Sequence, residues 1–291
     1  MVELATKVDR VTVMGPSLVA IAPRDLTRAV RDERACRPDV VIAAKEEPVT
    51  LLLAWTIGAP IRVGYREGGL GFLLTHYLPI RGGRPQHREL AALAGPAGAD
   101  AAPPVALVKD AAHEEVEGAL RSPGFDETLP TIVVHPGSGD PRTRWPWSRF
   151  AEALDLVSAQ RPLLVCLVGA GELEPRPVLY LPAPSRVLAL DAPLSIAGLA
   201  SLLASADLFL GNESGPSHLA AAVGTHAVVP FLSGNDPRRW GPAAPHGRVV
   251  EGPRGMGPDA EDVAQAILEL LSGSGGPGFP AGSGPAAAGT R

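Results

Sequence analysis

The chain has 291 residues, which favours two domains of ordinary size over a single one. Hydrophobic residues make up 45% of the sequence and charged residues 20%, a balance typical of a packed protein rather than a disordered one. The net charge of −5 argues against nucleic acid as a partner, because proteins that read a phosphate backbone are usually basic.

The N-terminus, MVELATKVDR, lacks the apolar segment of a signal peptide. The longest apolar run, residues 49–61, contains Gly58 and Pro60 and is shorter than the roughly 20 residues that cross a bilayer. The two cysteines, Cys36 and Cys166, are far apart, which argues against a disulfide framework and against metal-ligand spacing. These features predict a cytoplasmic protein that binds no metal.

The first half of the chain alternates between strand-like and helix-like segments. Strands are predicted at residues 9–15, 39–44 and 61–65, and helices at 49–60, 87–98 and 111–122. This alternation predicts a parallel sheet with helices on both faces. The turn-rich segment PGFDETLP, residues 123–130, indicates a boundary between domains 1–125 and 126–271.

The second half repeats the alternation. Strands are predicted at residues 131–137, 162–169, 186–191, 207–212 and 226–231, and helices at 147–159, 195–206, 216–224 and 259–273. Residues 272–291 are rich in Gly, Ser and Pro, which predicts a disordered tail. Two halves of this kind predict an α/β protein with two facing, doubly wound domains.

Ligands of open α/β sheets bind beyond the carboxyl ends of the strands, so the loops after strands are the candidate sites. The first is PGSGDPRTRWPW, residues 136–147, which combines glycines, a hydroxyl and arginines. The residues concerned are Gly137, Gly139, Ser138, Arg142 and Arg144. This combination suits a phosphate, although a solvent-exposed turn with arginines at its rim would look the same.

The second loop, AGELEP, follows the strand at residues 162–169. Gly169 and Gly171 begin a GxGxxG pattern, but Glu174 occupies the third glycine position, which argues against a dinucleotide site. Glu172 can accept hydrogen bonds from ribose hydroxyls, and it can equally be a solvated loop acid.

The third loop lies in LFLGNESGPSHLAAAVGTHAVVPF, residues 208–231. Ser214 or Gly215 is expected to cap a helix that has Pro216 in its first turn and ends at Gly224. The N-terminus of a helix carries partial positive charge and free N–H groups, which suit a diphosphate.

Three polar side chains surround this helix N-terminus. Ser217 and His218 add hydrogen-bond donors in the first turn, and Glu213 precedes it, where it can bind sugar hydroxyls. Simple capping explains Ser214 but not Glu213 and His218 together. A hydrolase is disfavoured because GNESG does not match the GxSxG pattern.

These three loops, in this order, resemble the bacterial heptosyltransferases of glycosyltransferase family 9. The matching segments are LAWTIGAPIRVGYREGG, LLTHYLPI, HRELAAL, VVHPGSG, RWPWSRFAEAL, LVGAGE, ASADLFLGNESGPSHLAAAVGTHAVVPF and SGNDPRRWGP. The likeness runs from about residue 8 to residue 270, and the Glu-Ser-Gly-x-x-His cluster and the Arg-Trp-Pro stretch are fairly specific together.

The resemblance implies the GT-B fold, with an acceptor-side domain at 1–125 and a nucleotide-sugar-binding domain at 126–271. It implies an inverting, metal-independent transfer, without a cofactor, from a nucleoside-diphosphate sugar such as ADP-heptose. The acceptor would be a glycan, as in lipopolysaccharide biosynthesis, or a small molecule. Peripheral association with a membrane is compatible with such a role.

The resemblance also implies roles for single residues. By position, Gly137 and Ser138 would hold the diphosphate, Glu172 the ribose, and Leu194 would pack near the base. Glu213, where the family usually has Asp, would hold the donor sugar. The phosphate end would be completed by Ser214, Gly215, Pro216, Ser217 and His218, with charge from Arg142 and Arg144.

The sequence departs from the family pattern in two places. Thr143 stands where a Lys commonly precedes the Trp-Pro pair, so a neighbouring arginine is expected to supply that charge. Family members also begin with a strand and a loop whose Asp is thought to be the general base. Compared with this pattern, the chain is expected to start at the second strand, and neither Asp9 nor Asp25 follows such a loop, so the catalytic base is unassigned.

Three functions are therefore compared. In the first, an acceptor hydroxyl attacks the anomeric carbon while the helix beginning near Pro216, with Ser138, His218 and Arg144, stabilises the leaving diphosphate. The second is a catalytically inactive nucleotide-sugar-binding protein, suggested by the missing first strand. The third is a sugar-nucleotide epimerase on the same fold.

Overall fold

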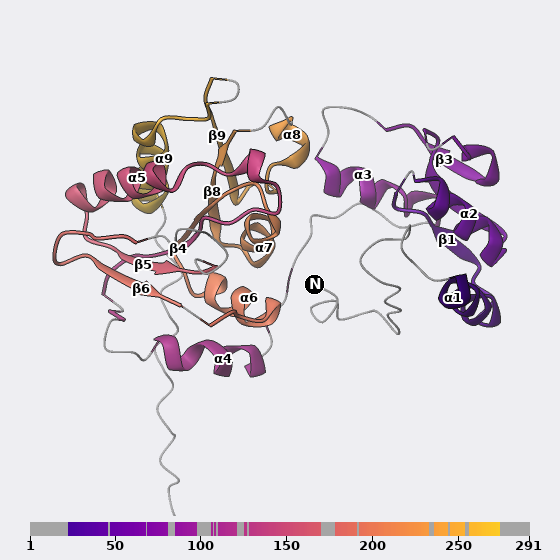
Figure 1. Cartoon of the computed structure of the whole chain (residues 1–291), viewed down its shortest axis with the longest axis horizontal. Helices are drawn as coiled ribbons and strands as arrows, with labels where there is room; N and C mark the ends of the chain where they lie inside the picture. Colours follow the sequence, from indigo (N-terminus) through magenta and orange to yellow (C-terminus); the bar gives the residue numbers. More distant parts are fainter. Residues whose placement is uncertain are drawn as a thin grey trace, which may run out of the picture. The chain divides into compact units, whose positions relative to one another are not determined.

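A computed structural model describes residues 23–45, 47–67, 69–80, 85–97, 106, 108, 110–120, 125–126, 128–169, 178–190, 192–232, 236–243, 245–253 and 256–273. Apart from the first five residues, the chain divides into two compact units, residues 6–104 and 105–291 (Figure 1). The strand predicted at residues 9–15 and most of the predicted tail lie outside the described residues.

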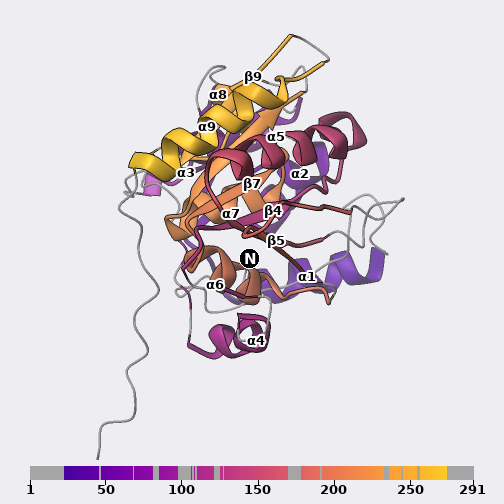
Figure 2. The same ribbon diagram turned by 90° about the vertical axis from the view of Figure 1, so that its left-hand side faces the viewer.

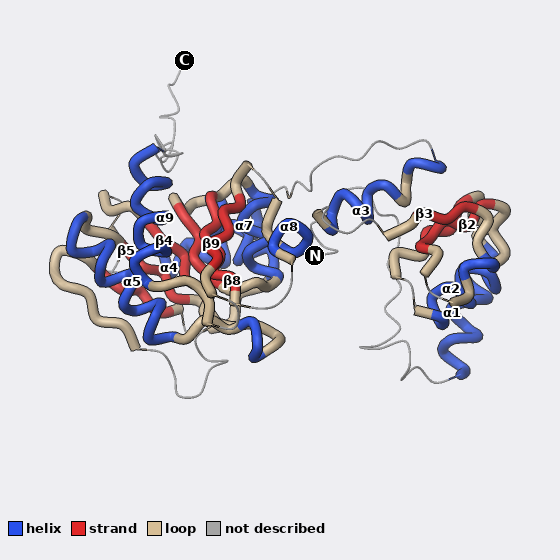
Figure 3. Tube along the Cα trace, turned by 90° about the horizontal axis from the view of Figure 1, so that it is seen from above, coloured by secondary structure: helices blue, strands red, loops and turns tan. Residues whose placement is uncertain are grey.

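The N-terminal unit contains a parallel sheet with the strand order β1-β2-β3. Its strands are β1 (Val40–Ile42), β2 (Ile61–Tyr65) and β3 (His76–Leu78), and its helices are α1 (Pro23–Ala35), α2 (Pro48–Ile57) and α3 (Gln86–Ala92), with 3-10 turns η3 (Gly71–Leu73) and η4 (Gly95–Ala97). Helices α1 and α2 pack side by side (Figure 3).

Helix α2 shows how local sequence sets the ends of an element. Pro48 occupies the first turn, where its missing N–H has no helical partner to lose. Gly58 ends the helix in the left-handed conformation, with φ of 84°, as the sequence predicts. Leu51 and Ala54 face inward and form a small core with Ala43.

The C-terminal unit is built on a six-stranded parallel sheet with the order β6-β5-β4-β7-β8-β9. The strands are β4 (Thr131–His135), β5 (Leu164–Leu167), β6 (Arg186–Ala189), β7 (Leu208–Gly211), β8 (His226–Phe231) and β9 (Gly247–Glu251). The chain builds outward from β4 to β6, then returns to β7 on the other side of β4. The border between β4 and β7 is therefore the point where the strand order reverses, the usual place for a ligand.

Helices cover both faces of this sheet. The helices are α4 (Asp110–Leu120), α5 (Trp147–Gln160), α6 (Ile196–Ala204), α7 (Gly215–Val223), α8 (Pro237–Trp240) and α9 (Ala260–Gly273), with the 3-10 turn η5 (Pro141–Thr143). Helices α5 and α9 lie on one side and α6, with α4 beyond it, on the other (Figure 2).

Alternation along β4 explains the two layers. Ile132 and Val134 enter the core beneath α5 and α9, whereas Val133 enters the core beneath α6 and α7. Successive side chains of a strand point to opposite faces, so an uninterrupted apolar strand is covered on both. The α/β fold class with parallel sheets that the sequence predicts is thus confirmed.

Helix α4 packs with the C-terminal unit, although the sequence-based boundary at residues 125 and 126 assigns it to the first domain. Val116 is fully buried in the core shared with α6, and the Glu115 carboxylate accepts hydrogen bonds from Ser195. These contacts are tertiary and leave little trace in the local pattern. At the other end, α9 continues to Gly273, two residues beyond the predicted domain end.

Among the described residues, no helix has the length and apolarity needed to cross a bilayer. Within the same part of the chain, no three or more His, Cys, Asp or Glu side chains lie together as metal ligands would.

Candidate functional site

The candidate site begins where β4 and β7 end. These strands are hydrogen-bonded neighbours, and His135 at the end of β4 lies opposite Gly211 at the end of β7. The loop after β4 and the N-terminus of α7 therefore start side by side, at the border where the strand order reverses. The sequence predicts both as ligand-binding segments, and the sheet brings them together.

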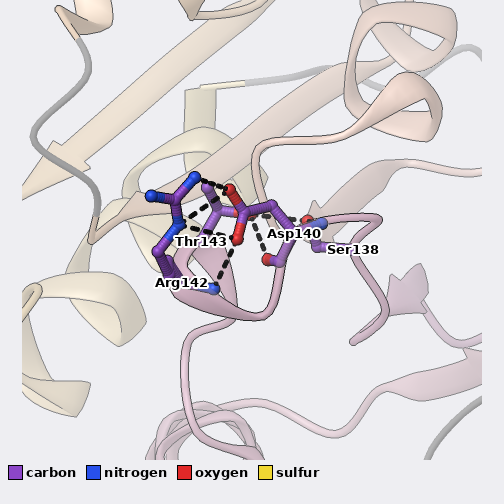
Figure 4. A network of polar contacts seen from close by, with 4 residues as sticks. All are labelled: Ser138, Asp140, Arg142 and Thr143. Carbon is purple, nitrogen blue, oxygen red and sulfur yellow. Dashed lines mark hydrogen bonds and ion pairs between the residues drawn. The ribbon is translucent and has the colours of Figure 1, made fainter.

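The loop after β4 is held by its own side chains (Figure 4). The Ser138 and Thr143 hydroxyl oxygens are 2.5 Å apart, and the Thr143 hydroxyl donates to the Asp140 carbonyl at 2.9 Å. Ser138 must therefore donate to Thr143, while its oxygen accepts from the Asp140 amide at 3.3 Å. Thr143, which stands where the sequence pattern leads one to expect a Lys, thus acts as an internal acceptor that fixes Ser138.

The two arginines of this loop are used differently. The Arg142 guanidinium binds the Asp140 carboxylate, with its Nη2 2.6 Å from Oδ2, and its side chain is 87% exposed. Hydrogen bonds from Arg142 lower the pKa of Asp140 to about 2, so this carboxylate stays charged at neutral pH. The charge of Arg142 is accordingly neutralised by a neighbour two residues away.

Arg144 instead turns toward the backbone of the loop. Its Nε and Nη2 atoms donate to the Ser138 carbonyl at 2.9 and 2.7 Å, and the residue is half-buried. A carbonyl carries no net charge, so this contact leaves the positive charge of Arg144 in place, and the Asp140 carboxylate interacts with Arg144 less strongly than with Arg142. Of the two predicted cations, Arg144 is the one placed to attract an anion.

The N-terminus of α7 has an unusual cap. Ser214 is the N-cap residue but makes no side-chain hydrogen bond to the helix, and its hydroxyl donates backward to the Asn212 carbonyl at 3.1 Å. A Cβ atom added at Gly215 would meet no other atom within 4 Å, so there is open space at this helix end. The first turn of α7 therefore lacks the side-chain cap that a serine there usually supplies.

The other polar residues of this turn are divided between interior and surface. Ser217 is 1% exposed and donates its hydroxyl to the Ser214 carbonyl at 2.8 Å, so this hydroxyl is engaged within the turn. His218 is exposed and Glu213 is half-buried, both at the same end of the helix. Pro216 lies in the first turn and Gly224 ends the helix with φ of 94°, both as predicted.

Helix α6, in the same layer, shows the contrasting arrangement. Its N-cap Ser195 accepts from the Gly198 amide at 2.9 Å. The Glu115 carboxylate of α4 covers this end and accepts from the amide and hydroxyl of Ser195 at 2.6 and 2.5 Å, which lowers the pKa of Glu115. The α6 N-terminus thus already holds an anion from the protein and a serine cap, whereas the N-cap Ser214 of α7 makes no side-chain hydrogen bond to its helix.

The remaining predicted residues are spread along the edge of the sheet. Gly137 is buried in the turn after β4. Leu194 precedes α6, beyond β6, and packs against the core beneath that helix. Glu172 lies outside the described residues. The structure thus brings Gly137, Ser138 and Arg144 next to the start of α7, while Leu194 lies further along the sheet.

Sequence reasoning missed Asn212, which the sequence indicates only as the end of a strand. Its side chain is fully buried and hydrogen-bonded to two separate parts of the loop after β4. The one available signal is an amide directly after an apolar strand, at the edge where ligands bind. Asp140 and Thr143 were likewise not recognised as the residues that hold Ser138 and Arg142.

Two parallel α/β units, the second with an anion-suited loop and helix end at its switch point, define a protein of the GT-B class. The family model for glycosyltransferase family 9 (heptosyltransferase) matches residues 25–266, and the chain belongs to this family. The resemblance inferred from the loop motifs is thereby confirmed.

Similar proteins agree with this assignment. A Haemophilus influenzae protein named "Putative glycosyltransferase" is 27% identical over 264 residues, which cover 85% of this chain and 75% of that protein. The crystal structure of a glycosyltransferase family 9 protein from Veillonella parvula has a TM-score of 0.72 at 22% identity, covering 87% of this chain and 79% of that one. The E. coli heptosyltransferase WaaC with ADP has a TM-score of 0.58 at 18% identity, covering 88% and 79%.

Proposed function

We propose that this protein transfers a heptose-like sugar from a nucleoside-diphosphate donor to a hydroxyl group of a glycan or small-molecule acceptor. The C-terminal unit binds the donor and the N-terminal unit the acceptor. The observation that carries this proposal is the α7 N-terminus, which has open space at Gly215 and no cap from the Ser214 side chain, next to the loop of Ser138 and Arg144. Membership of glycosyltransferase family 9 supports it.

The diphosphate is the part of the donor for which the site is best suited. The amides of the first turn of α7 and the half positive charge of the helix end attract one phosphate group. Arg144, with the backbone around Gly137 and Ser138, attracts the other. Structures of the E. coli heptosyltransferase WaaC with ADP and with ADP-2-deoxy-2-fluoro heptose support an adenosine diphosphate donor.

The transfer proceeds with inversion at the anomeric carbon. The acceptor oxygen attacks that carbon as its bond to the diphosphate oxygen breaks, and the acceptor proton passes to a base that is unassigned. Negative charge grows on the leaving diphosphate, where the α7 amides, Arg144 and His218 stabilise it without a metal ion. Glu213 binds hydroxyls of the donor sugar, Glu172 the ribose, and Leu194 packs near the base.

Calorimetry with ADP and an ADP-sugar, followed by a transfer assay with a lipopolysaccharide-core glycan acceptor, tests the proposal. We expect saturable binding of ADP and of the ADP-sugar, and release of ADP that depends on the acceptor. Absence of any nucleoside-diphosphate binding would contradict the proposal at its base.

The same assays separate the two alternatives. Tight binding without any transfer would favour an inactive nucleotide-sugar-binding protein. Formation of a new sugar or free nucleotide without an acceptor would favour a sugar-nucleotide epimerase.

Cytoplasmic location with peripheral binding to an anionic membrane completes the proposal. Support comes from α1, where exposed arginines recur at a spacing that places them on one face: Arg24, Arg28, Arg31 and Arg34. Co-sedimentation with phosphatidylglycerol vesicles, and none with phosphatidylcholine vesicles, is the expected result. Equal binding to both, or to neither, would remove this part of the proposal.

A further inference from the structure

Asn212 joins the two halves of the candidate site from beneath. Its Oδ1 accepts from the Trp145 amide at 2.8 Å, and its Nδ2 donates to the Pro136 carbonyl at 2.7 Å. Pro136 and Trp145 are the two ends of the loop that contains Ser138 and Arg144. One buried side chain therefore holds both ends of this loop.

The backbone of Asn212 reaches the other half. Asn212 follows β7 directly, and its carbonyl accepts the hydroxyl of Ser214, the N-cap residue of α7. The distance from the loop to the first turn of α7 is thus set by one residue and the two peptide units that follow it. Asn212 is fully buried, so it acts through these neighbours and not by touching a ligand.

An amide is the side chain that this position requires. It offers an acceptor and a donor on one planar group, and each meets a buried backbone partner. A carboxylate of the same shape would keep the acceptor for Trp145 but would place a second acceptor against the Pro136 carbonyl. An alanine would leave both backbone groups buried and unpaired.

We infer that Asn212 is a positioning residue that sets the spacing between the 136–145 loop and the α7 N-terminus, and thereby the preference of the site for a diphosphate over a monophosphate. This inference rests on the proposed function. A correctly spaced pair of anion subsites accommodates both phosphates. If the loop is released from Asn212, only the subsite at the α7 N-terminus remains in place.

The test compares ADP and AMP binding by calorimetry in the wild-type protein, Asn212→Asp and Asn212→Ala, at pH 8 and at pH 5.5. At pH 8 we expect both variants to lose about tenfold in ADP affinity, and about twofold at most in AMP affinity, from the loss of buried hydrogen bonds. Circular dichroism and thermal unfolding establish that each variant is folded.

The pH dependence separates positioning from a general loss of structure. Burial and the facing Pro136 carbonyl raise the pKa of the introduced carboxyl. Once protonated, that carboxyl can donate to Pro136 and accept from Trp145, as the amide does. The ADP affinity of Asn212→Asp relative to wild type should therefore recover at pH 5.5, whereas that of Asn212→Ala should not.

The outcomes distinguish the inference from the proposed function. If the wild-type protein binds neither nucleotide, the proposed function fails. If it prefers ADP and Asn212→Asp keeps that preference at pH 8, only the positioning role of Asn212 is wrong. Equal recovery of ADP affinity by Asn212→Asp and Asn212→Ala at pH 5.5 would also contradict the positioning role of Asn212. If either variant is unfolded at pH 8, Asn212→Ser, whose hydroxyl can replace one bond, is expected to show an intermediate loss, and an unchanged preference there would refute the inference.

Discussion

Replacement of Arg144 tests the electrostatic basis of the site. The guanidinium of this half-buried residue donates to the Ser138 carbonyl, so Arg144→Ala removes a positive charge and loosens the peptide that it holds. A charge pair about 5 Å apart at an effective dielectric constant of about 20 attracts by about 3 kcal/mol. Partial solvent exposure reduces this to about 2 kcal/mol, or about thirtyfold in the Kd for ADP.

Arg142→Ala is the matched control, because it removes the same charge from the same loop. The Arg142 side chain is 87% exposed and paired with Asp140, so its loss should weaken ADP binding by about threefold at most. Calorimetry in 50 mM and 300 mM NaCl measures both variants, and the gap between them should narrow in high salt. A larger effect of Arg142→Ala than of Arg144→Ala would refute the assignment of the anion-binding charge.

Two further predictions concern the loop and the strand that frame the site. A Cβ atom at Gly211 would lie 2.5 Å from the Phe209 ring, so Gly211→Ala should lower the unfolding free energy by about 1–3 kcal/mol. Gly215→Ala is the control, because there is open space around Gly215, and it should change the unfolding free energy by about 0.5 kcal/mol or less. Equal thermal midpoints for the two variants would show that the sheet relaxes around Gly211. Because Arg142 holds the pKa of Asp140 near 2, the stabilisation from this carboxylate should be present above about pH 4 and lost as the pH falls through 2. An NMR titration of the Asp140 carboxyl measures its pKa, and a midpoint near 4 would contradict the geometry of the Asp140–Arg142 pair.

The fold could be predicted from the sequence where residues that end helices, such as glycine, and apolar runs indicate the same elements. Gly58 and Gly224 end their helices in the left-handed conformation, and the apolar runs that became β4, β5 and β7 are buried on both faces. Strand β9 was missed because GRVVE is short and charged near both ends, and its pairing with β8 is a tertiary event.

The sequence indicated the segments of the candidate site but not the hydrogen-bond partners of their side chains. Loop composition singled out the two segments that the sheet places side by side, after β4 and before α7. It did not predict that Arg142 turns to Asp140 while Arg144 turns to a carbonyl, or that Thr143 fixes Ser138. Such choices depend on distances of a few ångströms within the folded loop, which residue types and spacing do not specify.

The strand order has a consequence for folding during synthesis on the ribosome. The bonds of Asn212 to Trp145 and Pro136 join positions 67 and 76 residues apart in the chain. A nascent polypeptide that has emerged only as far as β6 therefore possesses the loop but not the residue that holds it. The proposed nucleotide site can form only after β7 has paired with β4, and closing so long a loop is slow in folding. Capture of a fluorescent ADP derivative by stalled ribosome–nascent chain complexes would consequently report the moment when the sheet closes.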